Sequence, residues 1–263
     1  MEEITVREEN YFTITDVNQC MFRNHCDKFG SDVCTWQCHK MDGMNYLMSL
    51  SNLPLKYKRP QKLQTDCFRD DALAEYLDYI LSNPEFFVDQ GYNAYFYGPV
   101  GSGKTSWAVQ CLIAYFAAIS PKNGHNVSGL FVNAPKLLKD IKFHMTHKSE
   151  NFKELIETLE VTKLVVWDDI LQTDPTAFES QWIYSLINSR LMNGLSNIYT
   201  SNISPEQLQN IDIRLHSRVC EESDCLYFDC PDMRGSHKYS DHITYSKNYF
   251  KEHPEELQPG EFT

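Results

Sequence analysis

The sequence lacks a hydrophobic run long enough to cross a membrane. Its longest apolar stretch, residues 107–119, is broken by Gln110 and falls short of the roughly 20 residues that a bilayer requires. Residues 1–4 contain neither a basic nor an apolar segment, so we expect no secretory signal, no membrane partner and a cytoplasmic location. With 42% hydrophobic and 23% charged residues, the 263-residue chain can bury a sizeable core, which excludes a fibrous or disordered protein.

Basic residues are also scarce. The chain has 24 Lys and Arg against 36 Asp and Glu, which gives a net charge of -12. Such a chain is not expected to bind nucleic acid over its whole surface, so any such contact must be local. Residues 67–235 hold most of the acidity, with 13 basic and 22 acidic side chains. Positive charge clusters once, at Lys56, Lys58, Arg59 and Lys62. This cluster indicates either a solvated connector or a contact for nucleic-acid phosphate or for the acidic face of a partner.

The pattern of the chain indicates four consecutive parts and contains neither an internal repeat nor a low-complexity tract. They are a small cysteine-rich N-terminal module (1–50), a basic linker (51–66), a main domain (67–235) and a polar C-terminal tail (236–263).

The main domain alternates predicted strands and helices. Short runs rich in β-branched and aromatic residues predict strands at 94–97, 129–132, 164–167, 198–200 and 226–228. Apolar periodicity and length predict helices at 71–81, 105–119, 135–144 and 178–195. Alternation of this kind predicts an α/β fold with a parallel sheet covered by helices.

The strongest motif is a glycine-rich loop, G-x-x-x-x-G-K-T, placed between a predicted strand and a predicted helix. Its glycines let backbone N–H groups converge on phosphate oxygens, and the helix offers its positive N-terminal end to the same anion. Lys104 would reach the β and γ phosphates, and Thr105 would bind Mg²⁺, which its neighbour Ser106 cannot do from the same geometry. We therefore predict ATP and Mg²⁺ as cofactors. The predicted nucleotide-binding residues here are Gly98, Pro99, Val100, Gly101, Ser102, Gly103, Lys104, Thr105 and Ser106.

A second acidic element follows the predicted strand at 164–167. Asp168 would help to hold Mg²⁺, and Asp169 would orient or deprotonate the attacking water. Many such ATPases have Glu at the second position, and Asp169 is one methylene shorter. Two acids after a strand also occur as a helix N-cap.

Further polar residues fall where a nucleotide would need them. Asn202 ends a predicted strand and would contact the γ phosphate or the water, unless it is a turn residue. Arg214 and Arg218 share one helix face, from which an arginine could complete the site of a neighbouring subunit. Arg234 would contact the nucleotide within its own subunit. The alternative for each arginine is a surface salt bridge.

These motifs, in this order, resemble those of AAA+ ATPases of the DnaC/DnaI helicase-loader group. They are also similar to those of the related transposition helper IstB. The resemblance covers residues 54–235. It implies a five-stranded parallel sheet in the order 5-1-4-3-2 with helices on both faces and no full lid domain. It also implies that Arg190 is a second candidate for a contact between subunits. The sequence departs from the group at Trp167, at Asp169 and in its short N-terminal module. Phage-encoded loaders vary in such ways, so the resemblance is compatible with a phage-encoded protein.

By this resemblance, the chain is expected to hydrolyse ATP and to load a DnaB-like replicative helicase onto single-stranded DNA in a bacterial cell. An ATP-dependent homo-oligomer is implied. Two other functions remain open, an IstB-like transposition helper and a P-loop kinase of a small molecule. A third alternative is an ATP-gated switch that binds ATP without efficient hydrolysis.

The nine cysteines are expected to be reduced thiols or metal ligands. Four cluster within 19 residues, Cys20, Cys26, Cys34 and Cys38. We favour a structural Zn²⁺ site, which would stabilise a module too small to bury enough apolar surface. Buried free thiols or an iron–sulfur cluster are the alternatives, and His25 and His39 are alternative ligands. Cys67 and Cys111 are predicted as core residues, and ordinary burial is favoured over a metal site for Cys220, Cys225 and Cys230.

Overall fold

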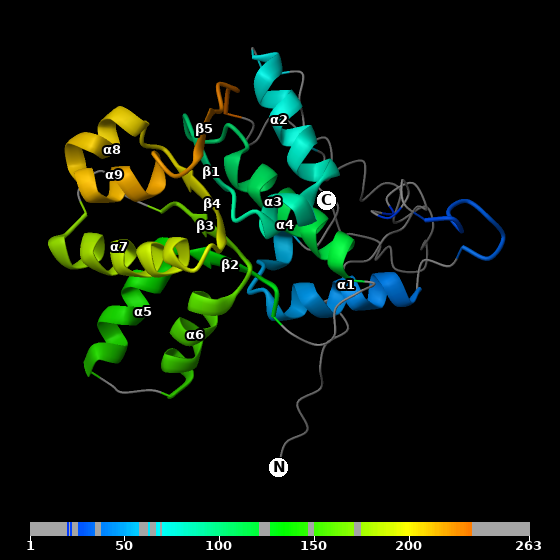
Figure 1. Cartoon of the computed structure of the whole chain (residues 1–263), viewed down its shortest axis with the longest axis horizontal. Coiled ribbons are helices and arrows are strands. Elements are labelled where there is room, and N and C mark those ends of the chain that lie inside the picture. Colours follow the sequence, from blue (N-terminus) through cyan, green and yellow to red (C-terminus); the bar gives the residue numbers. More distant parts are fainter. Residues whose placement is uncertain are drawn as a thin grey trace, which may run out of the picture.

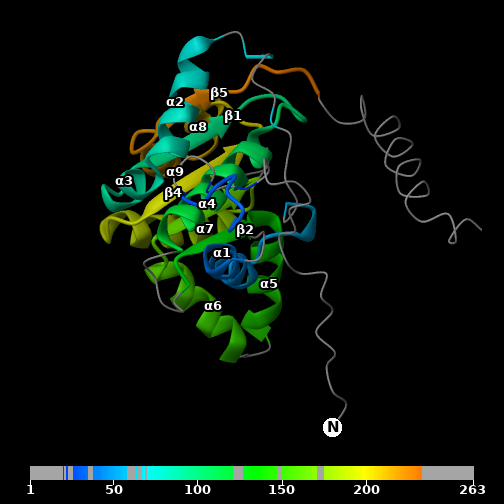
Figure 2. The same cartoon turned by 90° about the vertical axis from the view of Figure 1, so that its right-hand side faces the viewer.

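The computed structural model describes residues 20, 22, 26–34, 38–57, 63, 67–68, 70–120, 127–146, 150–170 and 175–232. A single sheet of parallel strands lies between two layers of helices (Figure 1). The view turned by 90° shows the same arrangement from the side (Figure 2). The α/β fold expected from the alternation of elements is therefore confirmed.

The sheet has five strands, β1 (Asn93–Tyr97), β2 (Gly129–Asn133), β3 (Leu164–Asp168), β4 (Ser196–Ser201) and β5 (Asp224–Tyr227). Their order is β2-β3-β4-β1-β5, which confirms the predicted order read from the opposite edge. The register pairs Tyr97 with Ser201 and Asn133 with Asp168. The carboxyl ends of β1, β2, β3 and β4 therefore meet at one end of the sheet, where the predicted site residues lie.

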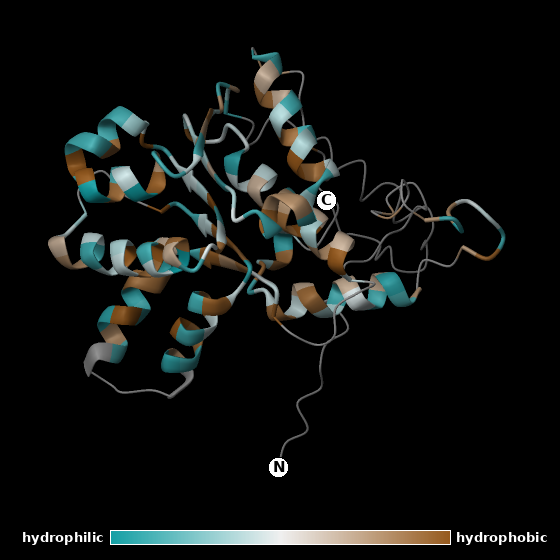
Figure 3. Cartoon of the chain, viewed as in Figure 1, coloured by the Kyte–Doolittle hydropathy of each residue, from teal (hydrophilic) through white to brown (hydrophobic). Residues whose placement is uncertain are grey.

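One helical layer consists of α1 (His39–Leu50), α2 (Asp71–Ser82), α3 (Pro84–Asp89) and α4 (Lys104–Ile119). These helices pack with Phe96, Val166 and Ile198 of the sheet in one hydrophobic cluster. Helix α4 is hydrophobic along most of its length (Figure 3). Its burial fixes the loop that precedes it against the sheet.

The opposite layer consists of α5 (Ala134–Thr146), α6 (Glu150–Val161), α7 (Ala177–Met192), α8 (Pro205–Ile211) and α9 (Ile213–Val219). It packs against Tyr95, Val165 and Tyr199, which neighbour the strand residues of the first cluster. Because successive strand side chains point to opposite faces, each central strand contributes to both clusters. The strands are therefore buried on both sides, as their nearly continuous apolar sequences indicate.

Helix boundaries follow local signals. Helix α7 begins with a capping box, in which Thr176 Oγ1 accepts from the Glu179 backbone N–H and Glu179 Oε2 accepts from the Thr176 backbone N–H. It ends at Met192, earlier than the predicted 195, because Gly194 turns the chain with a φ of 64°. Strand β5 begins at Asp224, before the predicted 226, because Asp224 pairs with Ala94 of β1 in spite of its polarity.

Helix α1, which the sequence assigns to the N-terminal module, packs within the same hydrophobic cluster as α4. Ser120 at the end of α4 donates to the Lys40 carbonyl oxygen over 2.8 Å. The Ser51 carbonyl accepts the Phe131 N–H over 2.8 Å, and a short 3₁₀ helix, Leu55–Tyr57, follows. The predicted basic linker therefore begins in contact with the edge strand β2. Of its four basic residues, Lys58, Arg59 and Lys62 lie outside the described residues.

None of the helices described above is long and apolar enough to cross a membrane.

Candidate functional site

The glycine-rich loop connects β1 to α4, as predicted. Gly98 and Gly101 have φ angles of 142° and 81°, which other residues adopt only with strain. A Cβ atom at Gly98 would overlap the Phe228 carbonyl oxygen, and one at Gly101 would overlap the Asp232 carboxylate. Glycine is thus required at both positions by backbone conformation and by close neighbours. The loop has the curvature and the donor groups that a chain of phosphates needs.

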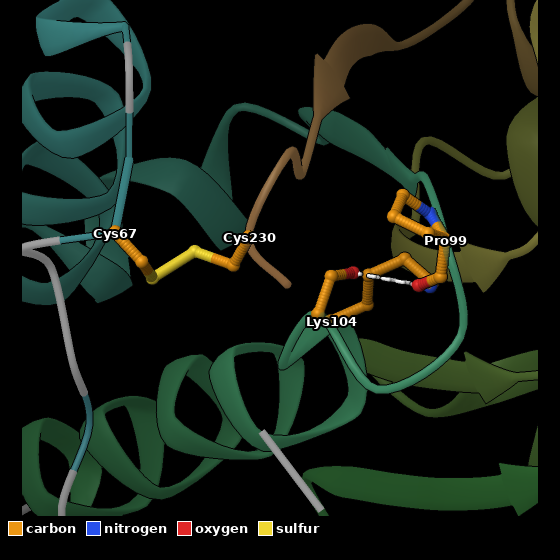
Figure 4. The surroundings of a disulfide bond; sticks show 5 residues. Cys67, Pro99, Lys104 and Cys230 are labelled. Atoms are coloured by element: carbon orange, nitrogen blue, oxygen red, sulfur yellow. Dashed lines mark hydrogen bonds between the residues drawn. A yellow bond between two sulfur atoms is a disulfide. The ribbon is translucent and has the colours of Figure 1, made fainter. Parts of the chain in front are cut away.

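Lys104 is buried, and its side chain turns back into the loop (Figure 4). Its Nζ atom donates to the Gly98 and Pro99 carbonyl oxygens over 2.8 and 2.7 Å and lies 3.4 Å from Ser102 Oγ. The ammonium group therefore lies inside the loop, next to the region where phosphate oxygens would bind. To reach a phosphate it must exchange carbonyl partners for anionic ones, which form stronger hydrogen bonds with a cation.

Thr105 and Asp168 meet at the base of the loop. Thr105 Oγ1 donates to Asp168 Oδ1 over 2.7 Å, and Asn133 Nδ2 lies 3.4 Å from Asp168 Oδ2. One hydroxyl and one carboxylate beside a phosphate-binding loop are a donor set suited to Mg²⁺, which binds one or two protein oxygens together with phosphate oxygens and water. The residues present therefore fit Mg²⁺–ATP.

Thr200 connects the two acidic residues. Its Oγ1 donates to Asp168 Oδ1 over 3.0 Å and accepts from the Asp169 backbone N–H over 3.1 Å. Asp169 has a φ of 52°, a conformation that is uncommon for residues other than glycine, and its side chain is exposed. Thr200 therefore fixes both the carboxylate that would hold the metal and the turn that presents the second acid.

Three members of this arrangement escape the sequence prediction. Asn133 and Thr200 lie at the carboxyl ends of β2 and β4, and Asp232 follows β5. The signal that identified Asp168, a polar residue at the end of an apolar run, also marks Asn133 and Thr200. Asp232 carries no comparable signal.

The sequence matches no family model, and no curated protein is significantly similar to it. The structure is similar to that of the DnaC helicase loader, with a TM-score of 0.53 and 20% identity, over 64% of this chain and 94% of that one. It is also similar to domain III of the Thermotoga maritima replication initiation protein DnaA, with a TM-score of 0.50 and 18% identity, over 76% and 79% of the two chains. The chain shares the fold of these two proteins, with the strand order that the resemblance to AAA+ ATPases implies. The resemblance to helicase loaders is thereby confirmed at the level of the fold.

Within this fold, the other described nucleotide-site residues that the sequence predicts, Val100, Ser106 and Asn202, are more exposed than Lys104. Val100 is exposed on the loop and Ser106 is half-buried in the first turn of α4. Asn202 is exposed just beyond β4, where Ser201 Oγ accepts the Ile203 N–H and turns the chain. Arg234 lies outside the described residues.

Arg214 and Arg218 lie on α9 and are at least partly exposed. Arg214 is paired with Asp212 over 3.2 Å, and its guanidinium lies 5.4 Å from the centre of the Tyr184 ring. Arg218 is 3.7 Å from Glu222. Each therefore has a partner on its own chain, and a role in a neighbouring subunit remains a prediction.

The prediction that Arg190 contacts another subunit is wrong. Arg190 is fully buried, and its guanidinium donates to Asn197 Oδ1 and to the carbonyl oxygens of Leu159, Thr162 and Ser196. Burial lowers the pKa of Arg190 to about 10. Its function is structural, because it joins the ends of α6 and α7 to the start of β4.

The expectation that all cysteines are thiols or metal ligands is also wrong. Cys67 and Cys230 form a disulfide across 163 residues of sequence. Cys67 is therefore not a free core thiol, although Cys111 is buried as predicted.

The four N-terminal cysteines are each partly exposed and free of disulfides. Burial is the main cause that raises the pKa of Cys20, and the charges of Cys34, Cys38 and Cys26 contribute, so the four lie near one another. Within the described ranges, no group of three or more His, Cys, Asp or Glu side chains is arranged to hold a metal ion. The Zn²⁺ site remains a prediction.

Proposed function

We propose that this chain binds and hydrolyses ATP with Mg²⁺, and that it uses this cycle as a replication accessory protein to load a replicative helicase onto single-stranded DNA. The observation that carries the ATPase part is the Thr105–Asp168 pair beside the glycine-rich loop. The loading role is supported by the motif order and by the similarity of the fold to the DnaC helicase loader.

The chain's own residues divide the chemistry among them. Bound Mg²⁺ supplies positive charge to the terminal phosphates. Lys104 turns from the carbonyl oxygens of the loop to the phosphate oxygens, and Thr105 and Asp168 hold the metal. Asp169 orients a water molecule or accepts its proton, and Thr200 holds the two acids in place. Positioning and electrostatics account for most of the catalysis of phosphoryl transfer.

The Asp169 side chain is exposed just beyond β3, and substitution of this residue tests the catalytic step directly. If Asp169 is the base, Asp169→Ala lowers turnover by about 10²-fold or more while ATP still binds. Unchanged turnover in Asp169→Ala favours instead an ATP-gated switch, in which binding alone orders the assembly.

For the role in helicase loading, we propose that the N-terminal module, with its Zn²⁺ site at Cys20, Cys26, Cys34 and Cys38, contacts a DnaB-like helicase. Arg214 and Arg218 would exchange their present partners for the nucleotide of an adjacent subunit in an ATP-dependent homo-oligomer. Arg234 would contact the nucleotide of its own subunit. A bacterial cytoplasm, with the gene carried by a phage, is the setting that this role implies.

Two measurements test the proposal. ATP binding by the full chain should be lost in Lys104→Ala, and unchanged binding in that variant would refute the nucleotide site. Co-purification of the chain with a hexameric replicative helicase, dependent on residues 1–50, supports loading. ATPase stimulation by duplex DNA without a helicase points to a transposition helper, and a phosphorylated small-molecule product points to a kinase.

A further inference from the structure

The Cys67–Cys230 disulfide lies beside the nucleotide loop. It joins the segment before α2 to the segment after β5, and the two Cα atoms are 5.2 Å apart. Figure 4 shows the bond near Lys104, at the start of α4, with Pro99 on the loop that precedes this helix. A covalent link in this position fixes residues that surround the loop.

Both linked segments contact the loop or its helix. The Phe228 carbonyl lies against Gly98, and the Asp232 carboxylate lies against Gly101. Phe68, next to Cys67, packs on Phe228 and on Trp107 of α4, with ring centres 5.7 and 5.8 Å apart. Residues 67–68 and 228–232 together therefore form one wall of the nucleotide loop, which we call the disulfide wall.

The disulfide wall places a negative charge on the loop. Asp232 is two residues beyond Cys230, and its carboxylate occupies the space beside Gly101, in the loop whose N–H groups would receive phosphate. A carboxylate in this place repels a triphosphate. Lys104, the positive group of the loop, is meanwhile held by the loop's own carbonyl oxygens. The disulfide-bonded arrangement therefore opposes nucleotide binding.

We propose that Cys67 and Cys230 are a redox modification site that controls access of ATP to the loop, an inference that rests on the proposed nucleotide-binding function. In the oxidised form the disulfide holds Asp232 against Gly101 and the affinity for ATP is low. In the reduced form the segment after β5 moves away and the affinity rises. Disulfides in proteins without an extracellular setting are mostly transient and redox-sensing, which agrees with a regulatory bond.

The reaction is a thiol–disulfide exchange with a dithiol reductant. One thiolate of the dithiol attacks Cys67 Sγ, which belongs to a partly exposed residue, and displaces the Cys230 thiolate. The second thiol of the reductant then displaces Cys67, so the reductant becomes a disulfide. Two electrons and two protons pass to the chain, which gains two thiols.

The test compares the affinity of the oxidised and the reduced full chain for a fluorescent ATP analogue. Oxidation state is checked by counting reactive thiols in the unfolded chain, with two more expected after treatment with dithiothreitol. We expect reduction to tighten binding by about tenfold, as removal of a nearby like charge does. Cys230→Ser should bind as tightly as the reduced chain and should not respond to the reductant, while Cys225→Ser, which removes an exposed free thiol, should behave as the unmodified chain.

A second variant keeps the test valid if Cys230→Ser does not fold. Asp232→Asn should bind ATP about tenfold more tightly in the oxidised form, because the repelling charge is lost while the disulfide stays. Asp229→Asn removes the same charge close by and should have a smaller effect. Equal affinity in the oxidised and reduced chain, or tighter binding by the oxidised chain, overturns the proposal.

The two proposals fail in different ways. If both redox forms bind ATP equally and Lys104→Ala abolishes this binding, the nucleotide site stands and the redox control is wrong. If neither form binds ATP, the proposed function fails, and the redox control fails with it.

Discussion

Thr105 and Asp168, which are 63 positions apart in the sequence, share a hydrogen bond of 2.7 Å at the point where α4 and β3 meet. The bond joins the first turn of the helix after the glycine-rich loop to the end of a central strand. Thr105 thereby donates to the carboxylate with which it would share a metal ion. A hydroxyl that donates its hydrogen keeps its lone pairs, so under the proposed function Thr105 Oγ1 would bind Mg²⁺ while still donating to Asp168.

Asp168→Asn is expected to abolish the effect of Mg²⁺ on nucleotide binding. An amide retains the size of the side chain but removes the negative charge that a hard cation requires. ATP hydrolysis should fall by about 10²-fold or more, because the metal that neutralises the developing charge is lost. Steady-state phosphate release, together with titration of ATP at several Mg²⁺ concentrations, measures both effects. Asp229→Asn is the control, and an unaltered Mg²⁺ response in Asp168→Asn would contradict the metal assignment.

Thr200→Val should separate catalysis from binding. Valine matches threonine in shape but leaves the part-buried N–H of Asp169 without its Thr200 acceptor, which costs about 1 kcal/mol of stability. Because Thr200 would not itself touch the phosphates, we expect hydrolysis to fall with little change in ATP affinity. Thr200→Ser retains the hydroxyl and should restore turnover. A loss of turnover in Thr200→Ser equal to that in Thr200→Val would show that the hydroxyl is not responsible.

Arg190→Leu should destabilise the fold by at least about 3 kcal/mol, because several buried acceptors lose their donor at once. Urea unfolding followed by circular dichroism measures this free energy. Arg218→Ala, at a partly exposed ion pair, should cost about 0.5 kcal/mol. If Arg190 instead formed an intersubunit contact, Arg190→Leu would alter assembly and leave the stability of the monomer unchanged.

Glu179 gives α7 a pH-dependent cap. Hydrogen bonds from Lys142 and from the backbone and hydroxyl of Thr176 lower the pKa of Glu179 from 4.5 to about 2. A carboxyl group with a depressed pKa in the folded state stabilises that state above its unfolded pKa, and this stabilisation is lost as the pH falls from about 4.5 to about 2.

The expected consequence is that Glu179→Gln is less stable than the unmodified chain at neutral pH, by about 1 kcal/mol or less. The difference should shrink as the pH falls below about 4.5 and should be small near pH 2, where the Glu179 carboxyl of the folded chain is half protonated. Thermal unfolding at a series of pH values measures it. Glu157→Gln, which removes an exposed i,i+4 pair with Lys153, should show a smaller difference. A difference for Glu179→Gln that does not change with pH would contradict the ionic contribution.

Much of the fold follows from local sequence. The glycine-rich loop, the acidic strand end and the alternation of apolar runs predict the five strands and helices α2, α4, α5 and α7, because each of these signals lies within a few neighbouring residues. Local signals do not determine the order of the strands in the sheet. The order was predicted from the resemblance to a known family. The site is predicted in the same way: Lys104, Thr105 and Asp168 belong to motifs, and their positions in the structure agree with those motifs.

The errors concern residues whose partners are distant in sequence. Arg190 looks like a surface residue near a helix end, and its acceptors come from the end of α6 and the start of β4, which no local pattern identifies. The pairing of Cys67 with Cys230 depends on the sheet bringing together two segments from opposite ends of the domain. Asp232 reaches the loop for the same reason. Interactions of this kind depend on the assembled fold.

The bond between the Ser51 carbonyl and the Phe131 N–H has a consequence for association. Phe131 belongs to β2, an edge strand, and an edge strand presents outward donors and acceptors to which a foreign strand can add. Ser51 occupies one of these donors, so the N-terminal segment shields the sheet from strand addition on this side. Removal of residues 1–57 would uncover that donor and favour aggregation by β-pairing, whatever the state of the nucleotide site.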